Sequence, residues 1–230
     1  MKRIHTHTLL RWAKRLLVYF AGIFFIALGI ALSARSGLGV SPVGSPANVL
    51  YQIGLDMGLP EHVFNLGNWT IVFYSLYILF QILALGRRFR PIQFLQIAVS
   101  VVFGWFVNLA SAAIAGLPAP VTYLGRLAYL APSIPLISLG VMTYLCPGLL
   151  PTPGEGVTLT LQERWNIPLP KGKTIFDCSV VGISAVLSLL YFHGLVGVRE
   201  GTIISALTVG AVMKLMQKLF QKPLLRFVER

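Results

Sequence analysis

The chain has 230 residues, of which 56% are apolar and 11% charged, and its mean hydropathy is +0.76. This composition excludes an ordinary soluble domain, because the apolar residues gather in blocks of about twenty, the length that crosses a bilayer. The net charge of +12 raises the question of nucleic acid, but no basic cluster is interleaved with aromatic residues as single-strand binders require, so we expect no nucleic-acid partner.

Six membrane spans are predicted in one all-α membrane domain. In chain order they cover about residues 16–34, 64–86, 92–115, 126–146, 174–193 and 201–220. A basic N-terminus (1–15) precedes them and a basic tail (221–230) follows. The fourth span carries Pro132 and Pro135, which a membrane helix tolerates when neighbouring groups or water satisfy the freed carbonyls.

The positions of Lys and Arg predict the orientation of the chain. With the N-terminus inside, all but three of the 19 basic residues fall on the cytoplasmic side, and the three outside are Arg35, Arg126 and Arg199. Both termini are therefore expected in the cytoplasm. The basic excess is expected to attract anionic lipids, and the tail to run along the membrane interface.

The chain contains an internal repeat. Residues 28–52 and 139–163 align without a gap at a shift of 111. The recurring residues are Leu28, Gly29, Gly37, Leu38, Pro42 and Leu50 in the first copy, and Leu139, Gly140, Gly148, Leu149, Pro153 and Leu161 in the second. After a slip of one residue, Phe64 and Asn65 meet Phe176 and Asp177. In the last span of each copy little matches beyond Arg90 with Arg199.

The two halves, 16–115 and 116–220, contain three predicted spans each. Because three is odd, the second half enters the membrane from the opposite side, and the repeat is inverted. Inverted repeats are the geometric basis of alternating access in transporters, and they also occur in channels. A chance resemblance is the alternative, since Gly and Pro gather at the ends of many spans.

Each half has a segment after its first span that is too short to cross and too apolar for an ordinary loop. The residues expected to break these segments are Gly37, Gly39 and Pro42, and in the second copy Gly148, Pro151, Pro153 and Gly154. We expect a short helix from Pro46 with Ser45 as N-cap, and a second helix from Pro153 whose dipole Glu155 complements. If these helices re-enter the membrane, their free N–H groups favour an anion or a carbonyl oxygen; helices lying on the surface are the alternative.

Four motifs resemble a known group of proteins. They are LGIALSARSGLGVSP at 28–42, PTPGEG at 151–156, KGKTIFD at 171–177 and VREGTIISALTVG at 198–210. Together they resemble the YczE-like branch of the YitT-related bacterial membrane proteins. The resemblance implies a six-span protein of the bacterial inner membrane, and because those families are largely without an assigned function it implies no site residues.

Ionisable residues inside spans are candidate functional residues, because they are costly there. Asp177 lies about one turn into the fifth span, and Lys214 is the cation of the sixth span deep enough to meet it, so we expect an Asp177–Lys214 ion pair or gate. Lys214 reaching the headgroups is the alternative. Arg35, at the outer end of the first span, is a candidate for holding a carboxylate or phosphate, or an interface anchor.

Four further polar residues are candidates for binding a solute. Gln52 and Glu163 occupy equivalent places in the two copies, Asn65 is the counterpart of Asp177, and Glu155 follows the second break. Roles as helix caps or solvated residues are the alternatives for Gln52, Glu155 and Glu163.

Enzyme signatures fail on inspection. The Gly-Lys-Thr at 172–174 lacks the earlier glycine of a phosphate loop, because Ile167 stands there, and neither HExxH nor GxSxG occurs. The four histidines lack ligand spacing. We therefore expect no enzyme, no cofactor and no metal.

These observations favour a transporter or channel for a small polar or anionic solute. A substrate-binding subunit of a larger importer is the first alternative, since Ala27 and Ala31 in the first span are similar to the Ala-xxx-Ala with which such subunits of energy-coupling-factor importers dock on a coupling protein. A regulatory or scaffold membrane protein is the second. A homo-oligomer is compatible with all three.

Overall fold

The computed structural model describes the backbone of residues 2–60, 63–64 and 66–229, and the side chains of 9–60, 63–64 and 68–228. The described residues form an all-helical protein with six helices long and apolar enough to cross a membrane. These are α1 (Lys2–Ser36), α3 (Leu66–Leu85), α4 (Gln96–Ile114), α5 (Tyr123–Leu145), α7 (Leu169–Phe192) and α8 (Glu200–Glu229).

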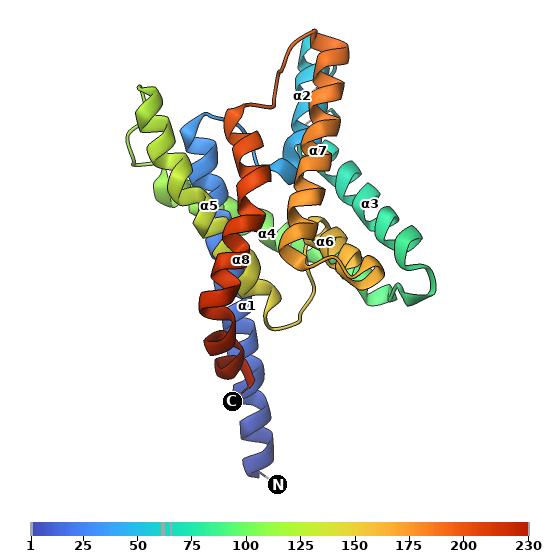
Figure 1. Cartoon of the computed structure of the whole chain (residues 1–230), viewed down its shortest axis with the longest axis vertical. Coiled ribbons are helices and arrows are strands. Elements are labelled where there is room, and N and C mark those ends of the chain that lie inside the picture. Colours follow the sequence, from blue (N-terminus) through green and yellow to red (C-terminus); the bar gives the residue numbers. More distant parts are fainter. Residues whose placement is uncertain (1, 61–62, 65, 230) are drawn as a thin grey trace.

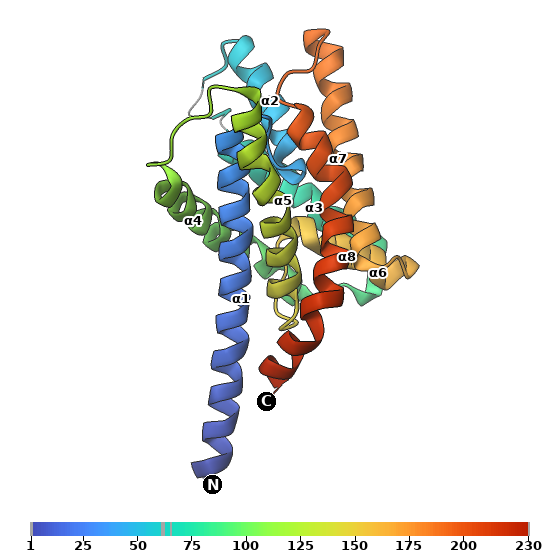
Figure 2. The same ribbon diagram turned by 60° about the vertical axis from the view of Figure 1, so that its left-hand side comes forward.

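Two short helices stand where the breaks were predicted. They are α2 (Ser45–Asp56), preceded by the single turn η1 (Pro42–Gly44), and α6 (Pro153–Trp165). Two more turns, η2 (Gly86–Arg88) and η3 (Pro91–Leu95), connect α3 to α4. Both termini lie at the same end of the molecule (Figures 1 and 2).

The centre of the fold is the antiparallel pair α1 and α5, which pack closely along their length (Figure 2). A Cβ on Gly29 would lie 2.6 Å from Cγ1 of Ile137, and a Cβ on Gly140 would lie 2.6 Å from Cγ1 of Ile26. Gly29 and Gly140 are repeat counterparts, and so are Ile26 and Ile137, so the same contact is made twice with the copies exchanged. This reciprocity is what a two-fold axis between α1 and α5 produces, and it confirms the inverted repeat.

The two helix breaks meet on this axis. A Cβ on Gly154 would lie 2.8 Å from Cγ1 of Val43, and Val43 is the counterpart of Gly154 at the shift of 111. A residue that touches its own counterpart must lie beside the axis. The breaks also share a backbone conformation, since Gly37 has φ +65° and Gly148 has φ +66°, a left-handed conformation that glycine adopts without steric cost.

The helix boundaries differ from the predicted ones at three places. The helix α1 includes the basic N-terminus, and α2 begins at Ser45 with Gly44 as its N-cap. The Ser45 hydroxyl instead donates to the Pro42 carbonyl at 2.7 Å and lies 2.8 Å from the Ser184 hydroxyl, so it does not cap α2. The helix α7 begins at Leu169, which places Lys173 inside a span rather than in a connecting segment.

Two features of the second half agree with prediction. Thr152 is the N-cap position of α6, Pro153 follows it, and Glu155 lies in the first turn. Pro132 and Pro135 lie within the continuous helix α5.

Candidate functional site

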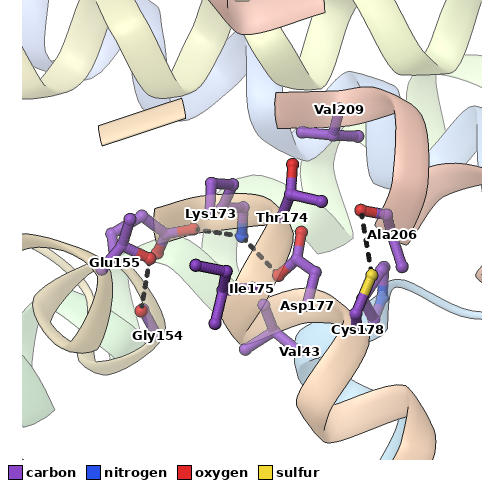
Figure 3. Close-up of polar contacts among 12 residues, drawn as sticks. Val43, Gly154, Glu155, Lys173, Thr174, Ile175, Asp177, Cys178, Ala206 and Val209 are labelled. Atoms are coloured by element: carbon purple, nitrogen blue, oxygen red, sulfur yellow. Dashed lines mark hydrogen bonds and ion pairs between the residues drawn. The ribbon is translucent and has the colours of Figure 1, made fainter. Parts of the chain in front are cut away.

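Three charged side chains are buried together where α6 meets α7. The Lys173 Nζ lies 3.3 Å from Glu155 Oε1 and 2.9 Å from Asp177 Oδ1 (Figure 3). The exposed fractions of Glu155, Lys173 and Asp177 are 8%, 3% and 1%. We call these three residues the ionic cluster.

Local structure explains how the chain positions the ionic cluster. Lys173 and Asp177 are one turn apart on α7, so their side chains share a face. Glu155 projects from the first turn of α6, where the helix dipole stabilises a carboxylate, and it accepts a hydrogen bond from the Thr152 hydroxyl. Asn166, in the left-handed conformation with φ 55°, ends α6 and lets the chain turn back into α7.

The ionic cluster holds more acid than base. Burying a charge is costly unless a partner and hydrogen bonds offset the loss of water. Two carboxylates share one ammonium, so with all three groups ionised the cluster carries one net negative charge. Binding one proton or one monovalent cation would make it neutral.

Two aromatic side chains, Tyr77 of α3 and Phe176 of α7, link the cluster to the first break. The Tyr77 ring packs edge-on against Phe176 at 5.1 Å, and the Lys173 Nζ lies 5.9 Å from the centre of the Phe176 ring. The Tyr77 hydroxyl donates to the Val43 carbonyl at 3.0 Å. The cluster is therefore connected to both helix breaks, through Glu155 in one and through Tyr77 and Val43 in the other.

A pair of buried amides lies beside the second break. Gln81 in α3 and Gln96 in α4 have no exposed surface, and each donates to the other, at 3.1 and 2.9 Å. Gln81 also donates to the Pro153 carbonyl at 3.3 Å. A Cβ at position 156 would lie 2.7 Å from the Gln81 amide and 2.8 Å from that of Gln96, so a side chain there would displace the amide pair.

A cavity of about 380 Å³ opens next to these groups. Its walls come from the end of α3, from η3 and from α6, and include Leu85, Gln93, Pro151, Gly156, Thr160 and Glu163. Pro151 and Gly156 flank the chain segment that contains Thr152 and Glu155, while none of the three residues of the ionic cluster lines the cavity itself. The elements that carry these residues, α6 and the connection from α3 to α4, lie toward the end of the molecule at which both chain termini lie (Figure 1).

The structure brings three of the predicted site residues to this region. Glu155 and Asp177 belong to the ionic cluster, and Glu163 is exposed in the cavity wall. Gln52 lies on α2, in the other copy of the repeat. Asn65 lies outside the described residues.

Arg35 lies apart from the ionic cluster. Its guanidinium donates to the backbone carbonyls of Ala115, at 3.3 Å, and Leu117. These contacts tie the end of α1 to the connection between α4 and α5, which is a structural use of the side chain.

The expected Asp177–Lys214 pair is wrong. Asp177 pairs with Lys173, while Lys214 is exposed on α8. The reason is that α7 begins earlier than predicted, at Leu169. Lys173 therefore lies on the same helix as Asp177, one turn before it, where its ammonium reaches the carboxylate directly.

Lys173, Gln81 and Gln96 were not among the predicted site residues. Lys173 was assigned to a cytoplasmic segment. The two glutamines stand in or next to apolar spans, and polar side chains in spans are themselves a signal of function. That signal identifies candidates but not the pairing of Gln81 with Gln96.

The expectation of an anion at the helix breaks also changes. The N-terminus of α6 already faces the carboxylate of its own Glu155. Its electrostatic preference is thus satisfied within the chain, and a second anion there would meet two carboxylates.

Comparisons with known proteins place the chain among relatives without an assigned function. The uncharacterized protein YyaS of Bacillus subtilis (strain 168) is 23% identical over 204 residues, which are 89% of this chain and 92% of that protein. No solved structure matches. A family model described as a family of unknown function (DUF6198) matches residues 13–218. The chain, a six-helix membrane protein built as an inverted repeat, therefore belongs to the DUF6198 family.

Proposed function

We propose that this protein is a proton-coupled secondary transporter for a small polar solute. The observation that carries the proposal is the ionic cluster, which lies beside the point where the two helix breaks meet on the axis of an inverted repeat. In transporters built this way, the solute and the coupling ion bind at discontinuous helices near the repeat interface.

Proton coupling follows from the charges of the cluster. A proton on Glu155 or Asp177 removes the net negative charge and one of the two attractions that hold Lys173. Because Glu155 stands on α6 and Lys173 on α7, protonation of Glu155 weakens the link between these helices. Proton binding and helix movement are thus connected through a single ammonium group.

The chemistry of the site favours a neutral or cationic solute over an anion. Both carboxylates of the cluster would repel an anion, whereas the amides and hydroxyls near the cavity, such as Gln93 and Thr160, suit neutral hydrogen-bonding groups. This proposal keeps the small polar solute predicted from the sequence and gives up the anionic one.

The orientation is part of the proposal. The end that carries both termini also carries most of the Lys and Arg residues, which favours a cytoplasmic position in a bacterial inner membrane. The cavity then faces the cytoplasm. We further propose that the protein works without a cofactor and without nucleic acid, that it is not an enzyme, and that anionic lipids surround it. Membership of the YczE-like branch remains a prediction.

Transport by the purified protein is the first test. Proteoliposomes containing a pH-sensitive dye would receive pulses of neutral amino acids, sugars and small amines. We expect one of these classes to drive proton movement, and Asp177→Asn to abolish it. Asp56→Asn is the matched control, because Asp56 is exposed at the end of α2 and contacts only the Tyr191 hydroxyl among the hydrogen bonds described.

Three other results would contradict the proposal. A solute that stabilises the protein against heat but moves only when a partner is added would identify a capture subunit of an importer. If the Asp177→Asn variant still moves the solute with undiminished proton flux, the ionic cluster is not the coupling site. A protein that neither binds nor moves any solute, and that co-purifies with a membrane complex, would be a scaffold.

A further inference from the structure

The two ends of the molecule differ although the repeat makes their parts equivalent. At the end with the termini, Leu85 of α3 lines the open cavity together with Leu159 and Thr160 of α6. At the shift of 111, the counterparts of Leu159 and Thr160 are Asn48 and Val49 on α2. After the slip of one residue, the counterpart of Leu85 is Gly197. The contacts made by these counterparts show which end of the molecule is closed.

At the opposite end the counterparts touch one another. The Asn48 side chain donates to the Gly197 carbonyl at 3.1 Å, and a Cβ on Gly197 would lie 3.3 Å from Val49. Val49 has no exposed surface. Residues that line the cavity at one end therefore have counterparts that contact one another at the other end.

A second set of counterparts shows the same difference. Gln93 and Pro151 line the cavity. The counterpart of Pro151 at the shift of 111 is Val40, and the counterpart of Gln93, with Arg90 aligned on Arg199, is Thr202. The Thr202 hydroxyl donates to the Val40 carbonyl at 2.9 Å.

Two more hydrogen bonds hold the start of α8 against the first break. The Arg199 guanidinium donates to the Gly37 carbonyl and the Gly201 N–H to the Leu38 carbonyl, each at 2.8 Å. These bonds, with those of Asn48 and Thr202, close the end away from the termini.

The long helices differ in the same way. The helices α7 and α8 pack side by side, while their counterparts α3 and α4 make no comparable contact and diverge from the hairpin that joins them (Figures 1 and 2). They are joined near this hairpin by the Gln81–Gln96 pair. One copy is thus in an open arrangement and the other in a closed one.

We infer that the protein has a second state in which the two copies exchange these arrangements. In it, α3 and α4 close over the present cavity, α7 and α8 separate, and a new cavity opens at the other end between Val40, Asn48, Val49, Gly197 and Thr202. The contacts on the axis persist, because exchange of the copies converts Val43–Gly154 into itself. The inference rests on the proposed transport function, for which it supplies the second face of an alternating-access cycle.

The lining of the new cavity indicates what passes through it. The five residues named above are uncharged, and the counterpart of the cavity residue Glu163 is the neutral Gln52. A solute leaving on that side meets amide, hydroxyl and backbone groups, and at the edge of the cavity the Arg199 guanidinium, which loses the Gly37 carbonyl when this end opens. This chemistry suits a neutral hydrogen-bonding solute.

Thiol labelling tests the second state without knowledge of the solute. The native cysteines are first removed with Cys146→Ser and Cys178→Ser. Val49→Cys is then introduced at the closed end, and its rate of reaction with a membrane-impermeant maleimide, added on the side away from the termini, is measured. Leu85→Cys with Leu159→Cys, or Gln93→Cys with Thr160→Cys, would be oxidised to a disulfide that holds the present cavity shut. Ala27→Cys, fully buried beside the axis, is the control reporter.

We expect either disulfide to form and to raise the labelling rate of Val49→Cys by at least about tenfold, with Ala27→Cys unchanged, because a state that is a minor one before locking becomes the major one. Disulfide formation with Val49→Cys still protected would overturn the second state. So would failure of both cysteine pairs to join, because the cavity walls would then never meet. Exchange of accessibility without solute movement in the proteoliposome assay would keep the second state and remove the transport function, so the two failures are distinguishable.

Discussion

At the scale of residues, the main feature is a lysine shared by two carboxylates in a buried position. Lys173 lies one turn from Asp177 along α7 and reaches Glu155 on α6. A removed partner leaves a buried charge without compensation, which costs more than the pair contributes when intact. Loss of one member of the ionic cluster should therefore destabilise the protein more than loss of one member of a surface ion pair.

Substitution of Lys173 measures this destabilisation. We expect Lys173→Met to lower the free energy of unfolding by about 3 kcal/mol, because two buried carboxylates lose the ammonium partner that the described residues give them. Lys171→Met is the matched control, since Lys171 is exposed on the same helix, and its effect should stay within about 0.5 kcal/mol. Unfolding in detergent micelles would be followed by circular dichroism.

A rescue variant separates charge from packing in this experiment. Adding Glu155→Gln and Asp177→Asn to Lys173→Met removes the two unpaired charges, so stability should largely return. Equal stability of Lys173→Met and Lys171→Met would show that the cluster is hydrated in the membrane and not electrostatically coupled.

The buried amide pair makes a second prediction at this scale. Gln81→Leu leaves the Gln96 amide buried without its partner, and we expect a loss of about 2 kcal/mol, whereas Gln81→Leu with Gln96→Leu should cost much less. Thermal unfolding of Gln81→Leu, Gln96→Leu, the double variant and the wild type tests this. If the double variant instead loses as much stability as the two single variants together, the pair contributes through packing with Gly156 rather than through its hydrogen bonds.

At the scale of elements, the two helix breaks act as one unit because they meet on the axis. Gly154 lies in the first turn of α6 and packs against Val43 of η1, and the left-handed Gly37 and Gly148 turn the chain before each break in the same way. The helix α6 is short and its first turn is buried, so its position depends on this contact rather than on its own length. A side chain at position 154 should therefore disturb both breaks together.

A double-mutant cycle tests the contact of the breaks. We expect Gly154→Ala to destabilise the protein by about 2 kcal/mol, since its Cβ would press on the Val43 side chain. Val43→Ala removes the methyl groups in the way and should restore part of the loss when combined with Gly154→Ala. Gly104→Ala is the control, because no atom lies within 4 Å of the Cβ it adds. Strictly additive effects would show that the two breaks do not press on each other.

At the scale of the whole molecule, the axis between α1 and α5 organises everything else. The pairs α1 with α4 and α5 with α8 are related by it, as are α3 with α6 and α7 with α2. The difference between α3–α4 and α7–α8 stands out against this symmetry. It turns a duplicated chain into a molecule with one open and one closed end.

The topology makes a prediction at this scale. In a chain free of its two native cysteines, Lys171→Cys should react with an impermeant maleimide only from the cytoplasm, and Asp56→Cys only from the outside. Both residues are exposed at opposite ends of the fold. Labelling of intact cells and of inverted vesicles distinguishes the two sides, and labelling of both positions from one side would contradict the inverted topology.

Much of the fold could be predicted because its signals are local in the sequence. Span lengths follow from runs of apolar residues, the breaks from Gly and Pro, and the inversion from an odd number of spans in each copy. The start of α6, with Thr152, Pro153 and Glu155 in their places, follows from the same kind of local rule. Where prediction failed by a few residues, at the start of α7, it misplaced Lys173 and so proposed Lys214 as the partner of Asp177.

The tertiary structure alone decided the pairings and the asymmetry. Lys173 joins Glu155 across two helices, and Gln81 joins Gln96, because packing brings their helices together. A repeat in the sequence is equally compatible with an opening at either end, so it cannot say which copy is closed. The sequence by itself determined a six-span inverted repeat with two breaks. The long-range contacts of Asn48 and Thr202 determined which end is shut.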